Sequence, residues 1–316
     1  MPIQTIKEKI SWKNGRYFPA EQAVLPVEDV GIVHGICLTE MMRTFSGQPY
    51  KQDRHLNRLL DSARLLNLPI HFSKEAIQQH LKQVVSHNQK LLPDWQEQGI
   101  IIFATPGLNT TYTGKSAKQE PTLFIHTFNL PAELWSQAIT DGQHLAVSAV
   151  PQLPMECVPP TVKHRSRLSF YLADLDVQKK FPDARAILLN QQGFVRETGT
   201  ANLFLIKNEQ LWTAPRQTVL PGISREVVTE IALELGIEVL EKDFSSQELE
   251  AADEIFTTST PYCLLAVSRL NGRQLAGKFP GKITRLILEC WDKKVGLDIH
   301  AQLLRIARHR EGVSEM

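Results

Sequence analysis

Apolar residues recur at helical spacing in several segments of the chain, and this pattern predicts amphipathic helices. One helix is expected to begin near Asp53, a plausible N-cap, and to end at Asn67. Its apolar face is formed by Leu56, Leu59, Leu60, Ala63 and Leu66. Further helices are predicted at residues 74–88, at residues 167–180, over the apolar positions from Val227 to Leu235, and from about Thr284 onward.

Short continuous apolar runs predict buried strands between these helices. The predicted strands cover residues 100–104, 121–128, 145–150, 186–190 and 202–206. Strands and helices alternate in both halves, and Asn129-Leu130-Pro131 is a plausible connection between them. The pattern therefore predicts an α+β chain in two domains. We expect a smaller N-terminal domain at residues 1–128, a connection at 129–137 and a larger domain at 138–316.

Composition excludes several classes of function. With 42% hydrophobic residues, 22% charged residues and a formal net charge of +1, the chain has no field that would attract nucleic acid or an anionic membrane. No apolar run approaches the length that crosses a bilayer. The four cysteines lack CxxC spacing, and the histidines form no metal-binding motif, so we expect reduced thiols, no metal and a cytoplasmic protein.

Four short blocks in the second half carry the candidate chemistry. They are the basic run around Lys163, the segment Arg196-Glu197-Thr198-Gly199-Thr200-Ala201-Asn202, the turn Leu220-Pro221-Gly222-Ile223-Ser224, and Thr257-Thr258-Ser259-Thr260. Each block alone has an ordinary explanation. A lone lysine in a basic run is usually solvated, a single strand glutamate usually lies at the surface, and any capped helix resembles the third block.

In this order and at these separations, the blocks resemble the fold-type-IV enzymes that use pyridoxal phosphate. That family contains branched-chain and D-amino-acid aminotransferases and aminodeoxychorismate lyase. The resemblance extends from about Val30 to Thr284, and Glu40-Met41-Met42-Arg43 stands where the family has its Glu-x-x-Arg strand. It implies a two-domain fold with the cofactor in the interdomain cleft, and a homodimer.

The resemblance assigns Lys163 to the Schiff base with the cofactor aldehyde, and this amine then moves protons on the substrate. Glu197 is expected to face the pyridine nitrogen and keep it protonated. The phosphate is assigned to the backbone and side chains of Leu220, Ile223, Ser224 and Thr260, because a helix N-terminus favours an anion. We expect Ser224 to be the N-cap of that helix.

Arg58 is a phosphate candidate by resemblance alone. Helical spacing places it away from the stripe of Leu56 and Leu59, and by that criterion it would be a solvated arginine.

The chain also departs from the family pattern. Leu168 stands where branched-chain aminotransferases usually carry a tyrosine, and the loop at residues 105–115 has no arginine to grip a substrate carboxylate. Arg43, Lys115 or Arg167 could supply that contact instead. His34 and Thr39 occupy places that are often aromatic, and we include them among the tentative substrate residues.

These observations predict an aminotransferase that moves an amino group between a small amino acid and a 2-oxo acid. Aminodeoxychorismate lyase is the alternative within enzymes, because the Arg167-Leu168 pair is closer to the lyase pattern. A non-catalytic protein that binds pyridoxal phosphate would have little reason to keep Glu197. Nucleic-acid binding through the basic run at Lys163 is the weakest alternative.

Overall fold

The computed structural model describes residues 6–114 and 120–312, and the chain divides into two compact units. The first unit contains the residues up to Leu130 together with Val162–Ser166. The second contains Pro131–Thr161 and the chain from Arg167 onward. The first division falls inside the expected connection at 129–137, whereas the assignment of 162–166 to the first unit differs from the expected range 138–316.

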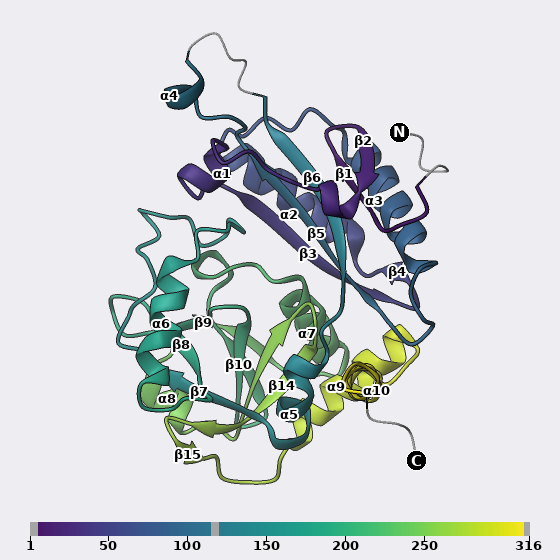
Figure 1. The fold of residues 1–316 in the computed structure, drawn as a ribbon. Coiled ribbons are helices and arrows are strands. Elements are labelled where there is room, and N and C mark those ends of the chain that lie inside the picture. The colour runs from purple at the N-terminus through teal and green to yellow at the C-terminus, as the bar shows by residue number, and fades with distance from the viewer. Residues whose placement is uncertain (1–5, 115–119, 313–316) are drawn as a thin grey trace. The chain divides into compact units, whose positions relative to one another are not determined.

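The first unit is built on a six-stranded antiparallel sheet in the order β2-β1-β6-β5-β3-β4 (Figure 1). Its strands are β1 (Ile10–Lys13), β2 (Arg16–Pro19), β3 (Leu38–Phe45), β4 (Gln48–Pro49), β5 (Gln98–Thr105) and β6 (Thr122–Asn129). Its helices are α1 (Val30–Val33), α2 (Gln52–Leu65), α3 (Lys74–Gln89) and α4 (Thr110–Thr113), with a 3-10 turn at Ala20–Gln22.

Helices α2 and α3 cover one face of this sheet, and a single hydrophobic core lies between these helices and the sheet. Leu56, Leu59 and Ala63 of α2 are buried there as their spacing predicts, together with Ile77 and Leu81 of α3. Asp53 is not the N-cap: α2 begins at Gln52, after Lys51 in a left-handed conformation. Asp53 instead lies in the first turn, where the helix dipole favours a carboxylate, and pairs with Lys74 of α3 at 3.0 Å.

The second unit contains the remaining strands and helices. Its strands are β7 (Gln143–Val147), β8 (Arg185–Leu189), β9 (Val195–Thr198), β10 (Asn202–Lys207), β11 (Gln210–Thr213), β12 (Val239–Glu241), β13 (Glu254–Ser259), β14 (Cys263–Leu270) and β15 (Arg273–Gln274). Its helices are α5 (Glu133–Asp141), α6 (Leu168–Gln178), α7 (Ile223–Glu234), α8 (Ser246–Glu250), α9 (Lys282–Val295) and α10 (Ile299–Arg310), with a 3-10 turn at Arg216–Thr218.

Six of these strands close into a ring. The strand order runs β10-β13-β14-β7-β8-β9, and β9 pairs in turn with β10. Every ring strand contributes to one buried cluster, with members Leu145, Ile187, Val195, Leu203, Leu205, Ile255 and Val267. A closed ring leaves few strand edges unpaired, and its interior is filled by these side chains.

The end of the chain differs from the single helix expected after Thr284. Helix α9 ends at Val295 because Gly296 adopts a left-handed conformation with φ of 76°, which favours glycine. Asp298 then begins α10 by accepting a hydrogen bond from the Ala301 backbone N–H at 2.7 Å. In the described residues, none of the helices has the length and apolar character needed to span a membrane.

Candidate active site

Glu197 lies at the point where the ring of strands closes. Glu197 belongs to β9 and is directly opposite Asn202 of β10, and it is 7% exposed. Glu197 Oε2 accepts hydrogen bonds from Asn202 Nδ2 at 3.4 Å and from the Leu220 backbone N–H at 3.3 Å. Asn202 Nδ2 also donates to the Leu220 carbonyl at 2.8 Å. Asn202 therefore fixes both the carboxylate and the turn that precedes α7.

The start of α7 is held against the same asparagine. The helix begins at Ile223 with Gly222 as its N-cap, so the prediction of Ser224 as the N-cap was wrong. A side chain on residue 222 would place its Cβ 2.0 Å from Asn202 Oδ1, and only glycine allows this approach. Ile223 and Ser224 lie in the first turn, whose backbone N–H groups have no partner within the helix and favour an anion.

The fourth block lies beside Asn202 as well. Thr258 on β13 pairs with Asn202 on β10, and Thr258 Oγ1 is buried without a hydrogen-bond partner among the residues that the structure describes. Ser259 Oγ donates to the Thr200 carbonyl at 2.8 Å, which joins the second and fourth blocks. Thr260 is half-buried in the turn after β13. Since buried hydroxyls are nearly always satisfied in proteins, the Thr258 hydroxyl indicates a place for a ligand atom.

Arg167 adds a cation to this part of the second unit. It is the residue before α6, and its guanidinium carbon lies 4.1 Å from the centre of the Phe170 ring. A Cβ atom on Gly199 would lie 3.8 Å from Arg167 Nη2, so the guanidinium sits next to the turn that follows Glu197. The second unit thus brings together a buried carboxylate, a helix N-terminus, hydroxyl groups and one arginine.

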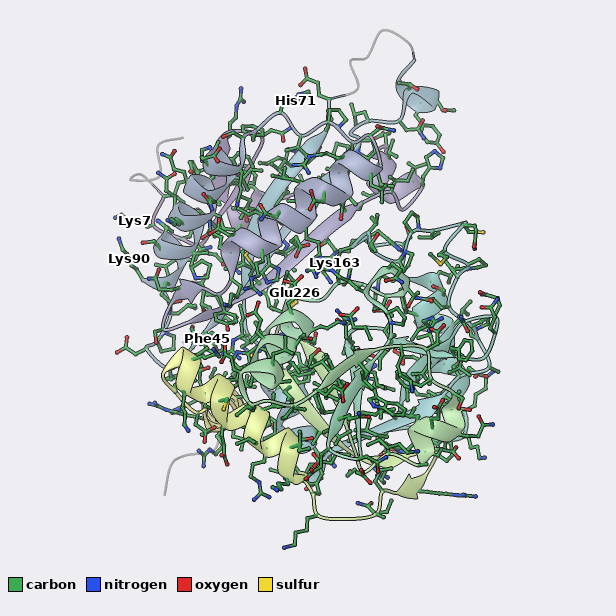
Figure 2. The ribbon with its side chains drawn as sticks, turned by 180° about the vertical axis from the view of Figure 1, so that it is seen from behind. Lys7, Phe45, His71, Lys90, Lys163 and Glu226 are labelled. Carbon is green, nitrogen blue, oxygen red and sulfur yellow. The ribbon has the colours of Figure 1, made fainter. Side chains whose placement is uncertain are left out.

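Lys163 is positioned by the first unit (Figure 2). The Lys163 carbonyl accepts from the Thr39 N–H at 2.9 Å, and the Arg165 N–H donates to the Cys37 carbonyl at 2.8 Å. His164 also forms a bridge with Leu38, so this segment extends along the start of β3. These backbone bonds explain why residues 162–166 belong to the first unit. Thr39 is 7% exposed, and its hydroxyl has no hydrogen-bond partner in the described residues.

Arg58 is buried. Helical spacing alone predicted a solvated arginine at this position, and that prediction is wrong. Arg58 is 9% exposed and pairs in a bidentate manner with Glu40 of β3, through Nε to Oε1 and Nη2 to Oε2, each at 2.7 Å. His55, one turn earlier on α2, places Nδ1 2.8 Å from Glu40 Oε2. A carboxylate only accepts, so the imidazole donates from Nδ1.

The charges in this group follow from its burial. Burial alone raises the pKa of Glu40, but the charge and hydrogen bonds of Arg58, with those of His55, outweigh it and lower that pKa to about 2. Burial lowers the pKa of His55 more than Glu40 raises it, and the Lys163 ammonium lowers it further. Near neutral pH the group is therefore a carboxylate, a guanidinium and a neutral imidazole.

The tentative substrate residues fall into different environments. Arg43 is fully buried, with its guanidinium carbon 4.0 Å from the centre of the Phe45 ring. His34 is exposed at the end of α1, and its Nε2 accepts from Asn109 Nδ2 at 2.9 Å. Asn109 belongs to the loop that lacks an arginine. Lys115 lies outside the described residues.

Sequence reasoning missed two residues that organise the site. Asn202 appeared only as part of a pattern, although it contacts Glu197 and Leu220 and adjoins Gly222. His55 was not identified at all. Its signal was a second stripe on α2, formed by His55, Arg58 and Ser62 at helical spacing beside the apolar face, and all three are buried.

Comparison with known proteins identifies the family. The model of the amino-transferase class IV family matches residues 38–270. A protein of Methanocaldococcus jannaschii, provisionally assigned as a branched-chain-amino-acid aminotransferase, is 30% identical over 87% of this chain and 93% of its own. The D-alanine aminotransferase of Bacillus licheniformis is 26% identical over 86% of this chain and 92% of its own. The crystal structure of the branched-chain aminotransferase of Thermoproteus uzoniensis with norvaline superposes with a TM-score of 0.80 at 25% identity, covering 90% of this chain and 94% of that one.

The chain belongs to the class IV aminotransferases, and it is a pyridoxal-phosphate-dependent aminotransferase with their α+β two-domain fold. The comparisons favour this activity and not the lyase alternative. The residues of the second unit fit the cofactor, because Glu197 supplies a buried carboxylate and Thr258 a buried hydroxyl that lacks a partner in the described residues. Gly222 allows the start of α7 to approach Asn202 closely, so the first turn of this helix lies near the Glu197 carboxylate.

Glu40 should make the protein acid-sensitive. Its pKa is about 2, against an ordinary 4.5, so its contribution to folding is fully present above about pH 4.5 and is lost as the pH falls toward 2. Glu40→Gln should lower the free energy of unfolding by about 3 kcal/mol at pH 7. In urea titrations, this difference from the wild type should shrink as the pH falls from 4.5 toward 2.

The control for this measurement is Glu234→Gln. Glu234 forms a surface pair with Lys294, and its side chain is 58% exposed. The substitution should therefore lower the free energy of unfolding by less than about 1 kcal/mol, both at pH 7 and at pH 3. A Glu40→Gln deficit that stays constant from pH 7 to pH 3 would contradict the assigned charge state.

Proposed function

We propose that Lys163 is the lysine that binds the cofactor covalently and that Glu197 faces its pyridine nitrogen. The observation that carries this proposal is the convergence of Glu197, Leu220 and the start of α7 on Asn202. A buried carboxylate next to an anion-binding helix end matches the two polar ends of this cofactor. Lys163 would supply the amine, and its backbone is fixed by the hydrogen bond from Thr39.

When bound, pyridoxal phosphate withdraws electrons from the substrate α-carbon. The residues of this chain would control where the protons lie during that chemistry. Glu197 would keep a proton on the pyridine nitrogen, since its negative charge favours the protonated ring and the bonds from Asn202 and Leu220 hold the carboxylate in place. The Lys163 amine would take a proton from the substrate α-carbon and pass it to the cofactor, not back to the substrate.

The phosphate would be held by the backbone N–H groups of Ile223 and Ser224, by the Leu220 turn and by Thr260. The first turn of α7 supplies both unpaired N–H groups and the positive end of the helix dipole. Arg58 would join them as a further cation, with its guanidinium oriented by the bidentate pair with Glu40. In this role Glu40 and His55 would orient Arg58 without contacting the phosphate themselves.

We propose small, largely apolar amino acids and their 2-oxo acids as substrates. Support comes from the relatives, which are named for branched-chain amino acids and D-alanine. Arg167 is the best-placed candidate for the substrate carboxylate, since its guanidinium lies next to the turn after Glu197. Thr39 and His34 would contact the rest of the substrate.

We also propose that the enzyme works as a homodimer in the cytoplasm. The family resemblance supports the dimer. The four cysteines form no disulfide in the described residues, which agrees with a reducing compartment.

Borohydride reduction of the purified enzyme should fix the cofactor on Lys163. The Schiff base becomes a stable amine, so peptide mapping by mass spectrometry should find the added mass on the peptide that contains residue 163. Lys163→Ala should remain unlabelled, whereas Lys179→Ala, which alters an exposed lysine beyond α6, should be labelled normally. Label on any other lysine would refute this assignment.

Glu197→Gln should keep the cofactor but lose most of its turnover. The amide can still accept a hydrogen bond from Leu220, but it carries no charge to hold the pyridine proton. We expect kcat to fall by about a hundredfold or more, in the range typical of lost acid–base assistance, with cofactor affinity changed far less. Glu241→Gln, at a half-exposed carboxylate that pairs with Arg225, serves as the control. Full activity in Glu197→Gln would show that the carboxylate is assigned wrongly.

Single amino acids should convert the bound cofactor to its amine form, and a 2-oxo acid should restore it. We expect this half-reaction with either the L-branched-chain amino acids or D-alanine, followed through the visible absorbance of the cofactor. Arg167→Ala should raise the amino-acid concentration needed for half-conversion by about tenfold, as expected for a lost charge-assisted contact. An unchanged requirement would remove Arg167 from the substrate site.

A further inference from the structure

Tyr262 is a buried residue in the hairpin loop that also contains Thr260. Strands β13 and β14 pair as far as Ser259 and Cys263, so residues 260–262 form the loop between them. Thr260 is half-buried, whereas Tyr262 is 3% exposed. The loop therefore keeps its tyrosine inside the second unit and leaves its threonine accessible.

The Tyr262 side chain is held by three other elements of the second unit. Its hydroxyl forms a hydrogen bond of 3.1 Å with Thr257 Oγ1 of β13, and Thr257 in turn donates to Gln143 Oε1 at the start of β7. The aromatic ring lies beside Trp135 of α5, with the ring centres 5.9 Å apart. Ring and hydroxyl are thus both fixed by partners outside the loop.

The same hydroxyl is connected to the turn that follows Glu197. Tyr262 also forms a hydrogen bond with the side chain of Ser259, and Ser259 Oγ donates to the Thr200 carbonyl at 2.8 Å. Burial raises the pKa of Tyr262 to about 12, although its hydrogen bonds oppose this shift. The phenol is therefore uncharged at neutral pH and keeps its proton for these bonds.

The backbone of the loop also requires such support. Cys263, which follows Tyr262, has a φ of 63° although it carries a Cβ atom, and it is 1% exposed. A residue other than glycine adopts this left-handed conformation at a cost in free energy, and it persists only where surrounding contacts impose it. The Tyr262 carbonyl accepts from the Leu264 N–H at 2.8 Å, so the tyrosine is held at both its backbone and its side chain.

Thr260 is where this support has a consequence for the cofactor. A side chain that binds a ligand must be held close to its productive position by neighbours that are themselves fixed by packing and hydrogen bonds. Tyr262 lies two residues after Thr260 and meets that description. Its own hydroxyl is bonded inside the second unit, so it would act on the cofactor only through Thr260.

We propose that Tyr262 is the positioning residue for Thr260, and that its buried hydroxyl fixes the loop in the conformation that presents Thr260 to the cofactor phosphate. This inference rests on the phosphate role proposed above for Thr260. It adds the residue on which that role depends.

The direct test is Tyr262→Phe in the full-length enzyme, which removes the hydroxyl and keeps the ring. Equilibrium dialysis should show the dissociation constant of pyridoxal phosphate raised by about tenfold, as expected for a weakened contact to an anion. The phosphorus-31 signal of the bound cofactor should shift or broaden, because the phosphate has lost a fixed partner. The value of kcat at saturating cofactor should stay within about twofold of the wild type, since Lys163 and Glu197 are unchanged.

The matched control is Tyr17→Phe in the first unit. The Tyr17 phenol also has a pKa that burial raises to about 12, and it forms hydrogen bonds with His80 and Gln83. This variant removes the same group, so it can destabilise the fold, but it should bind the cofactor with wild-type affinity and an unchanged phosphorus-31 signal. Wild-type cofactor binding in Tyr262→Phe, or an equal loss in Tyr17→Phe, would overturn the proposal.

Variants of Thr257 keep the test decisive if Tyr262→Phe does not fold. Thr257→Val removes the hydroxyl that faces Tyr262 and should also weaken cofactor binding by about tenfold, whereas Thr257→Ser retains a hydroxyl and should bind normally. The double variant Thr257→Val/Tyr262→Phe should bind no more weakly than either single variant, because both changes break the same bond. Normal binding in Thr257→Val, or fully additive losses in the double variant, would contradict the proposed role.

Thr260→Val separates this inference from the proposed function. Weaker cofactor binding in both Thr260→Val and Tyr262→Phe would support both roles. Weaker binding in Thr260→Val alone would leave the phosphate role of Thr260 standing and refute the role of Tyr262. Normal binding in Thr260→Val would refute the phosphate role, and the positioning role of Tyr262 would fall with it.

Discussion

The pairing of β9 with β10 is the constraint on which the second unit depends. At this pair the ring of strands closes, and Glu197 and Asn202 stand opposite each other. Asn202 then holds the Leu220 turn through its amide and allows Gly222 to approach its oxygen, so α7 starts beside the Glu197 carboxylate. The fold thus places a negative group and an anion-binding helix end at one point without long flexible side chains.

The first unit depends on a different polar contact. Glu40 and Arg58 form a buried bidentate pair between β3 and α2, and His55 completes it. Such pairs stabilise little relative to apolar packing, but removing one partner leaves a buried charge and is costly. The pair therefore fixes the orientation of α2 on β3, and the preceding residue of that strand, Thr39, holds the Lys163 backbone.

Much of this architecture follows from local sequence patterns. The apolar stripes of α2, α3 and α7 and the runs that form β5, β6 and β10 are local properties, and the structure places these elements close to their predicted bounds. Local patterns gave wrong predictions where a residue far away in the sequence determines burial, helix capping or the assignment to a unit. Arg58 is buried because Glu40 lies across from it, Gly222 replaces Ser224 as the cap because Asn202 approaches it, and residues 162–166 join the first unit because they pair with β3. The roles proposed for Lys163 and Glu197 came from the order of the motifs, since neither residue stands out alone.

In the proposed mechanism, Glu197 holds a proton on the pyridine nitrogen of the cofactor. The most direct measurement is the nitrogen-15 chemical shift of cofactor labelled at that nitrogen, recorded for the wild type and for Glu197→Gln at neutral pH. We predict a protonated nitrogen in the wild type and an unprotonated one in the variant. The same shift in both proteins would contradict the account.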